Sequence, residues 1–260
     1  MKKALLTVSF GTSHLDTLDK TIAAIERDVA AAMPGREARR AFTSGMIIKK
    51  LRERDGIVIP NVSEALASLA GEGFGDVVIQ PTHILNGEEF EKLRGMAQPY
   101  ETRFERMAIG APLLTEVGDY RDLASALIEE MPPLRADTAI VWMGHGTDHH
   151  SNSVYAMLEY MMHDCGRTDV FIGTVEGYPG IEEVLRRVKG STDVKNVLLC
   201  PLMIVAGDHA RNDLAGSEPD SWLSRFSAGG YRTACRLAGL GESAAARRIF
   251  VRHALTAAGE

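Results

Sequence analysis

The sequence lacks any apolar run that approaches the roughly 20 residues needed to span a bilayer, so no membrane partner is expected. It also has few cysteines: Cys165, Cys200 and Cys235 are widely separated, odd in number and without a CxxC spacing. This usage excludes a disulfide framework and argues against a zinc knuckle. We therefore expect a soluble protein of the reducing cytoplasm.

An excess of positive charge is missing as well. Lysine and arginine number 29 against 35 acidic residues, which gives a formal net charge of −6. A nucleic-acid-binding surface has to neutralise phosphates with a basic face. The basic residues here form only local pairs such as Arg39–Arg40. No nucleic-acid partner is expected.

The first residues lack the pattern of a secretory signal. Two lysines and a short apolar stretch open the chain, but Gly11 and the polar residues after it arrive before a full apolar core is complete. No small-residue cleavage site follows. We expect this stretch to be the first β-strand of the fold.

The sequence does contain a regular alternation of short, β-rich apolar runs with longer segments of helical periodicity. Such alternation, with continuous apolar strands such as NVLLCPLMIV, is typical of parallel strands covered by helices on both faces. The expected fold class is therefore α/β, with doubly wound parallel sheets. The expected strands are 4–10, 38–43, 76–82, 106–110, 138–143, 169–175, 196–205 and 231–236. The expected helices are 15–32, 45–53, 62–71, 87–98, 119–130, 149–163, 180–189, 208–214, 219–227 and 243–257.

Three motifs occur twice, in the same order, which indicates an internal repeat. The paired segments are LLTVSFGTS with AIVWMGHGTD, FTSGMI with VEGYPG, and VVIQPTHILNGEE with VLLCPLMIVAGDH. The repeat predicts two similar domains, at 1–117 and 118–260. The last helix has the alternative of packing back on the first domain.

Candidate functional residues follow from this repeat, because the carboxyl ends of parallel strands face the crevice where open α/β sheets bind ligands. Three residues of each half fall there: Phe10, Ser44 and Glu89 in the first half, and His145, Glu176 and His209 in the second. Two imidazoles and a carboxylate are a suitable ligand set for Co²⁺, Ni²⁺, Fe²⁺ or Zn²⁺. The alternatives are structural: a hydrogen-bonded histidine at a strand end, and a helix N-cap or a surface carboxylate for Glu176.

The remaining candidates carry open alternatives of their own. His83 is either a strand-end functional group or a packed histidine, since its partner in the repeat is the apolar Met203. Glu89 is either a proton acceptor or an acid on a helix surface. The segment SFGTSH lacks both GxGxxG and GxxxxGK[ST], so no nucleotide site is expected.

Several motifs together resemble the anaerobic sirohydrochlorin cobaltochelatases, a class II chelatase family related in fold to ferrochelatase. They extend over nearly the entire chain and comprise KKALLTVSFGTS, RAFTSGMIIKKLRERDGI, HILNGEEFEK, MGHGTDHH, VEGYP, PLMIVAGDHARNDLAG and PDSWLSRF. The resemblance implies two similar α/β domains with a ligand cleft between them. It also implies insertion of Co²⁺ into sirohydrochlorin, without ATP, on the oxygen-independent route to cobalamin.

Within this resemblance, the metal ligands fall on His145, Glu176 and His209, and the two histidines are also the expected catalytic residues. Near pH 7 an imidazole is able to bind Co²⁺ or to accept a pyrrole proton. The expected substrate contacts are Phe10, Ser44, His83 and Glu89. The expected partners are sirohydrochlorin and divalent cobalt, with no other cofactor.

Some alternatives stay open at this point. The same ligand types accept Fe²⁺ or Ni²⁺ in place of Co²⁺, and a carrier of metal or tetrapyrrole would need the same residues without turnover. A metal-dependent hydrolase is less favoured, because the chain has no HExxH motif. A homo-oligomer is a further open alternative.

Overall fold

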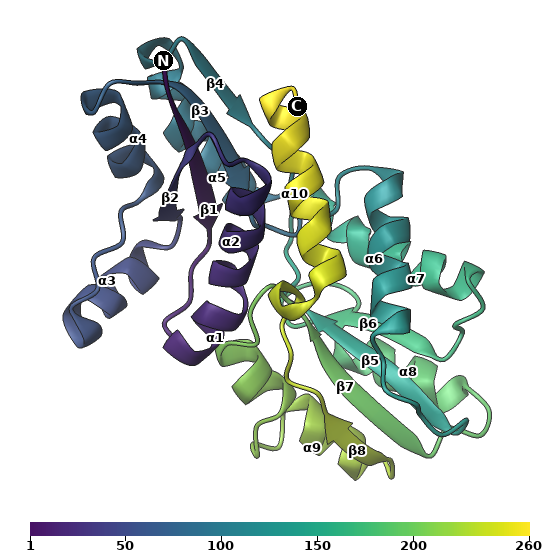
Figure 1. Ribbon diagram of the computed structural model, residues 1–260. Helices are drawn as coiled ribbons and strands as arrows, with labels where there is room; N and C mark the ends of the chain where they lie inside the picture. Colours follow the sequence, from purple (N-terminus) through teal and green to yellow (C-terminus); the bar gives the residue numbers. More distant parts are fainter. The chain divides into compact units, whose positions relative to one another are not determined.

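The computed structural model of the protein describes residues 1–260, which form two compact units. The N-terminal unit comprises Met1–Thr115 together with Ala244–Glu260, and the C-terminal unit comprises Glu116–Ser243. The sequence predicts ranges of 1–117 and 118–260. The two descriptions differ in helix α10 (Ala244–Ala258), which contacts α2 (Ile22–Ala32) and β3 (Phe74–Pro81) of the N-terminal unit. Figure 1 shows α10 beside α2.

The N-terminal unit contains one parallel sheet of four strands in the order β2-β1-β3-β4. These strands are β1 (Lys2–Ser9), β2 (Glu37–Phe42), β3 and β4 (Arg106–Ile109). The α-helices of this unit other than α2 and α10 are α1 (Leu15–Lys20), α3 (Gly45–Asp55), α4 (Val62–Gly71) and α5 (Glu88–Ala97). A 3₁₀ segment, Gln98–Arg103, follows α5.

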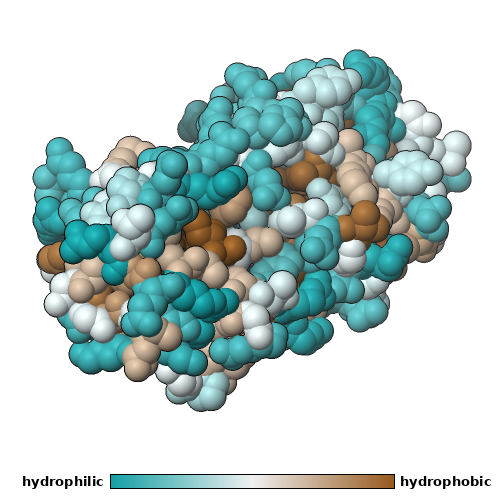
Figure 2. Space-filling model, turned by 90° about the horizontal axis from the view of Figure 1, so that it is seen from above, coloured by the Kyte–Doolittle hydropathy of each residue, from teal (hydrophilic) through white to brown (hydrophobic).

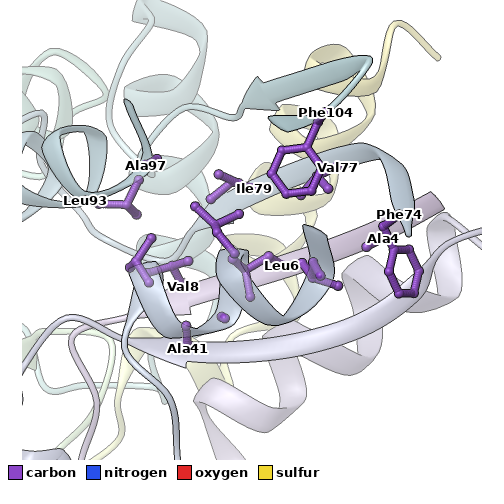
Figure 3. Packing of buried hydrophobic residues seen from close by; sticks show 14 residues of the cluster. Ala4, Leu6, Val8, Ala41, Phe74, Val77, Ile79, Leu93, Ala97 and Phe104 are labelled. Carbon is purple, nitrogen blue, oxygen red and sulfur yellow. The ribbon is translucent and has the colours of Figure 1, made fainter. Parts of the chain in front are cut away.

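One core of this unit lies between the sheet and the helices α4 and α5. Alternate residues of β1 point to this side, as the period of two in a strand requires, and Figure 3 shows Leu6 and Val8 packed near Ile79 of β3. Leu93 of α5 joins the same cluster with no exposed surface. Burying a leucine of this kind contributes about 1.5–3 kcal/mol relative to leaving it exposed.

The C-terminal unit contains a second parallel sheet, in the order β6-β5-β7-β8. Its strands are β5 (Thr138–Gly144), β6 (Val170–Thr174), β7 (Asn196–Leu202) and β8 (Arg232–Cys235). Its α-helices are α6 (Val117–Glu129), α7 (Ser153–Asp164), α8 (Ile181–Gly190) and α9 (Trp222–Ala228). Short 3₁₀ or π segments lie at His150–Asn152, Ala210–Leu214 and Leu240–Glu242.

The two sheets have the same topology, which confirms the internal repeat. β1, β2, β3 and β4 correspond in order and direction to β5, β6, β7 and β8. Individual hydrogen bonds repeat as well. The Ser44 N–H donates to the carbonyl of Phe10 at 3.2 Å, and the Glu176 N–H donates to the carbonyl of His145 at 2.8 Å. The residue pairs that the sequence motifs match therefore occupy equivalent places in the two units.

The expected strands and helices are present in their expected order, with local differences. The helix expected over 15–32 is broken at Thr21, whose φ of −118° and ψ of −84° lie outside the helical region. Residues 210–214 form a π-helical turn instead of an α-helix. None of the helices combines the length and the apolar character needed to cross a bilayer. On the face shown in Figure 2, hydrophilic residues predominate and apolar ones gather in small, separate areas.

Candidate metal centre

His145 lies immediately after β5, in a turn that depends on glycine. Gly146 has a positive φ of 84°, a backbone conformation that side chains with a Cβ rarely adopt. A Cβ at this position would lie 2.5 Å from the backbone nitrogen of Gly177. Glycine therefore allows the loop after β5 to approach the loop after β6, and this approach brings His145 next to Glu176.

Two side chains that the sequence analysis does not single out hold these loops. The Asn152 side chain accepts from the Thr147 N–H at 3.1 Å and donates to the carbonyl of Tyr178 at 2.6 Å, so it links the two loops. The Tyr155 hydroxyl accepts from the Gly146 N–H at 3.4 Å. Burial raises the pKa of Tyr155, so the phenol is neutral at pH 7.

Glu176 occupies the loop between β6 and α8. The alternative that it caps a helix is wrong, because α8 begins at Ile181 with Gly180 as its N-cap residue. The acid that accepts from the Gly180 N–H, at 3.0 Å, is Glu183. The Glu176 side chain is 56% exposed, which leaves its carboxylate available to a ligand.

His209 follows β7 and directly precedes the π-helical turn Ala210–Leu214. Ala210 and Leu214 are fully buried and anchor this turn in the unit. The His209 side chain is partly exposed, and its Nδ1 lies 2.8 Å from Oδ2 of Asp213. Asp213 is a further residue that the sequence analysis does not select.

The three predicted metal ligands meet in the C-terminal unit. Each of His145, Glu176 and His209 offers one ligand atom, and these atoms all lie within 4.8 Å of one another. The imidazole centroids are 4.7 Å apart with the rings nearly perpendicular, at 88°. Nδ1 of His145 is 3.6 Å from Oε2 of Glu176.

This geometry suits a divalent cation. Metal–nitrogen and metal–oxygen bonds of about 2.0–2.2 Å place two donors of a tetrahedral site about 3.4 Å apart, so small side-chain rotations would close the three groups around one ion. The donor set of two imidazoles and one carboxylate is typical of borderline metals.

The N-terminal unit has no such cluster at the equivalent strand ends. Phe10 follows β1 and is 45% exposed. The Ser44 hydroxyl accepts from the Ile47 N–H at 3.4 Å and so acts as the N-cap of α3. The Glu89 carboxylate accepts from the Thr43 hydroxyl at 2.6 Å and lies 3.5 Å from the Lys92 ammonium. The difference between the units therefore lies in the side chains at equivalent positions.

His83 lies after β3, and both its ring nitrogens are shielded from solvent without a hydrogen-bond partner. Burial lowers the pKa of His83 to about 4, an effect that Glu89 partly opposes. The imidazole is therefore neutral at pH 7. Of the two alternatives from the sequence, the structure shows the packed ring. Contact of His83 with a substrate stays a prediction.

Comparisons with known proteins agree with this picture. The model of the cobalt chelatase (CbiK) family matches residues 3–259. A curated relative from Salmonella typhimurium, named sirohydrochlorin cobaltochelatase, is 49% identical over 253 residues, which cover 97% of this chain and 95% of that protein. Sirohydrochlorin cobaltochelatase CbiKC from Nitratidesulfovibrio vulgaris is 34% identical, over 99% of this chain and 90% of that one.

Among solved structures, SirB from Bacillus subtilis with Fe³⁺ has a TM-score of 0.70, over 100% of this chain and 97% of that chain. At 14% identity this likeness concerns the fold alone, and it confirms the expected architecture of two parallel α/β units. The sequence relatives and the family match show more than the fold, because the identities of 49% and 34% and the family model hold over nearly the whole chain. The chain belongs to the cobalt chelatase (CbiK) family.

Proposed function

We propose that the protein inserts Co²⁺ into sirohydrochlorin, without ATP, in the anaerobic pathway to cobalamin. The observation that carries this proposal is the cluster of His145, Glu176 and His209, with ligand atoms within 4.8 Å of one another. It occurs in a chain that is 49% identical to a sirohydrochlorin cobaltochelatase. A cytoplasmic location is part of the proposal, since Cys165, Cys200 and Cys235 are free thiols.

The metal is the substrate of this reaction, and the three clustered side chains would receive it. Two neutral imidazoles and one carboxylate would replace water ligands of the ion while offsetting part of its charge. The side chains of His145 and Glu176 are about half exposed, and His209 is partly exposed. Such exposure gives a hydrated ion direct access to the donors.

Insertion also releases two protons, because Co²⁺ replaces the two pyrrolic N–H hydrogens of the ring. An imidazole that is neutral near pH 7 can accept such a proton. His145 and His209 are the proposed catalytic residues for this step, and Glu176 completes the metal contact. The free energy comes from the metal–nitrogen bonds formed in the product, so the reaction needs no nucleotide.

The proposed substrate contacts of the N-terminal unit are Phe10, Ser44, His83 and Glu89. The exposed ring of Phe10 is suited to pack against an apolar macrocycle face. Ser44, after β2, and Glu89, at the start of α5, offer polar atoms. His83 is neutral at pH 7, so it would add no charge to a contact with the substrate.

A single assay separates this function from its alternatives. Purified protein is incubated with sirohydrochlorin and Co²⁺, and insertion is followed by visible absorption. We expect rapid insertion that is lost in His145→Ala and His209→Ala but retained in His163→Gln, whose histidine bonds to the Val170 carbonyl away from the cluster. Parallel assays with Fe²⁺ and Ni²⁺ rank the metals. Binding of the tetrapyrrole without faster insertion would identify a carrier instead.

A further inference from the structure

The two histidines of the metal centre have different partners at Nδ1. Nδ1 of His145 lies 2.9 Å from the backbone carbonyl oxygen of Gly146. Nδ1 of His209 lies 2.8 Å from the side-chain carboxylate of Asp213. A neutral imidazole has one N–H, and the acceptor that this N–H meets decides which nitrogen remains free to bind a metal.

His209 and Asp213 lie at a π-helical turn, and their spacing of four residues puts the two side chains on the same side of it. The Ala215 N–H donates to the Ala210 carbonyl at 3.2 Å, a bond that spans five residues as in a π-helix. Fully buried Ala210 and Leu214 fix the inner side of this turn. His209 and Asp213 are left together on its partly exposed side, four residues apart.

The equivalent segment of the N-terminal unit shows that the carboxylate is no requirement of the fold. In the repeat, Glu89 corresponds to His209, and the residue four positions after Glu89 is Leu93. Leu93 belongs to the regular helix α5 and is fully buried in the core. The C-terminal unit thus differs here in its helix type and in having a carboxylate four positions after the aligned residue, beside a candidate metal ligand.

We propose that Asp213 is a positioning residue for the metal: its carboxylate accepts the Nδ1–H of His209 and so keeps Nε2 as the nitrogen that binds Co²⁺. This inference rests on the proposed function, because it assigns a role toward the metal that the centre receives. A carboxylate in this place fixes the tautomer and the ring orientation of a ligating histidine and makes the ring a stronger donor. Asp213 acts through His209 and does not itself contact the metal.

The first measurement concerns the tautomer and needs no metal. In ¹⁵N-labelled protein, the His209 ring should show a protonated Nδ1 and a free Nε2 in the wild type. In Asp213→Ala we expect this preference to be lost, while the His145 ring, with its backbone partner at Gly146, keeps its wild-type pattern. Asp213→Glu should restore the wild-type pattern at His209. A purely structural role for Asp213 would not give this selective change.

The second measurement is the Co²⁺ dissociation constant, determined by titration without tetrapyrrole. Loss of such an outer partner weakens metal binding by about 10–100-fold, which we expect for Asp213→Ala, with partial recovery in Asp213→Glu. The matched control is Asp220→Ala, which removes an exposed carboxylate seven positions further along the chain. It should bind Co²⁺ as the wild type does.

Two failures are distinguishable in this design. If Asp213→Ala keeps both the His209 tautomer and the Co²⁺ affinity of the wild type, the inference is overturned and the proposed function stands. If the wild type itself binds no Co²⁺, the metal centre and the inference fall together. If the wild type binds Co²⁺ but does not speed its insertion, the proposed function is contradicted. The role of Asp213 is then still decided by the tautomer and Co²⁺ affinity measurements.

Discussion

The N-terminal and C-terminal units have the same sheet topology and the same hydrogen bond between the first two strand-end loops, yet only one of them gathers metal donors. Where the C-terminal unit has His145, the N-terminal unit has Phe10, and where it has His209, the N-terminal unit has Glu89. The shared backbone supplies three neighbouring positions at the carboxyl ends of strands. The side chains at these positions decide whether a unit can bind a cation.

The turn that presents these residues is also shared. Gly11 and Gly146 both have positive φ, at 105° and 84°. Their surroundings differ, since a Cβ on Gly11 would meet the Phe42 ring at 2.6 Å and one on Gly146 would meet the Gly177 backbone at 2.5 Å. The N-terminal unit packs a core side chain under this turn, whereas the C-terminal unit places a second ligand-bearing loop there.

The largest expected effect comes from giving the C-terminal unit the residues of its counterpart. His145→Phe combined with His209→Glu should leave one carboxylate pair in place of the mixed donor set. We expect Co²⁺ insertion to fall by more than about 100-fold, beyond the cost of losing an outer partner of a ligand. Insertion kinetics and Co²⁺ titration measure this, and near-normal insertion would mean that the metal binds elsewhere.

A second prediction concerns a buried ion pair that the repeat does not share. Arg36 and Asp76 form two hydrogen bonds of 2.9 Å in the N-terminal unit, where the C-terminal unit has Asn196 in place of Asp76. Removing one partner of a buried pair costs about 3–5 kcal/mol. Asp76→Asn should therefore lower the free energy of unfolding by that amount in chemical denaturation.

An exposed pair provides the control for this prediction. Asp19 and Arg27 have side chains 77% and 60% exposed, so Asp19→Asn should change the free energy of unfolding by less than about 1 kcal/mol.

The pH dependence of the stabilisation by Asp76 has a definite sign. Burial opposes ionisation of Asp76, but hydrogen bonds and charge from Arg36 and Arg106 outweigh it and hold its pKa below the ordinary 3.8. The stabilisation is thus present above pH 3.8 and is lost as pH falls through the lower pKa. Equal losses of unfolding free energy in Asp76→Asn and Asp19→Asn would contradict the predicted difference between a buried and an exposed ion pair.

The third prediction uses His83, whose counterpart is Met203. In the unfolded chain this histidine gains its proton near pH 6.5, whereas burial in the folded protein delays protonation to about pH 4. The unfolded state therefore binds more protons between these values, and stability falls as pH falls from 6.5 to 4, by at most about 3 kcal/mol. His83→Met should remove this part of the pH dependence. Unfolding curves at pH 7, 5.5 and 4.5 test it, and an unchanged slope would contradict the assignment.

The smallest expected effect concerns the shared glycine turn. Gly11→Ala and Gly146→Ala both force a side chain into a positive-φ conformation, which costs about 1–3 kcal/mol of stability. Only Gly146→Ala should also weaken Co²⁺ binding, because its Cβ would push apart the loops that carry His145 and Glu176. Thermal unfolding measures the first effect and Co²⁺ titration the second. Similar losses of Co²⁺ affinity in both variants would show that the turn acts only through overall stability.

The sequence was sufficient for much of the fold and for the three clustered residues. The alternation of apolar runs and helical segments predicts the eight strands. The repeated motifs place His145, Glu176 and His209 at the ends of strands, where the structure brings them together. These predictions succeed because strand ends in a parallel sheet are fixed by local patterns and by a general rule of sheet geometry.

The supporting residues could not be predicted in the same way. The role of Asn152 depends on the distance between two loops, and no periodicity distinguishes the π-helical turn beside Asp213 from an α-helix. The spacing of four residues between His209 and Asp213 was the one available signal. The sequence leaves both units open to the last helix, because its place depends on long-range contacts, such as the bond from Arg247 to Asp28.

The return of α10 to the first unit has a consequence for synthesis of the chain. Residues 116–243 form one uninterrupted stretch and can acquire all their native contacts soon after they leave the ribosome. The preceding 115 residues must wait until residues 244–260 have been translated before their last helix can dock. During that interval, the parts of α2, β3 and β4 that α10 later contacts lack their cover, and so do the apolar residues that dock with it, Ile249 and Phe250.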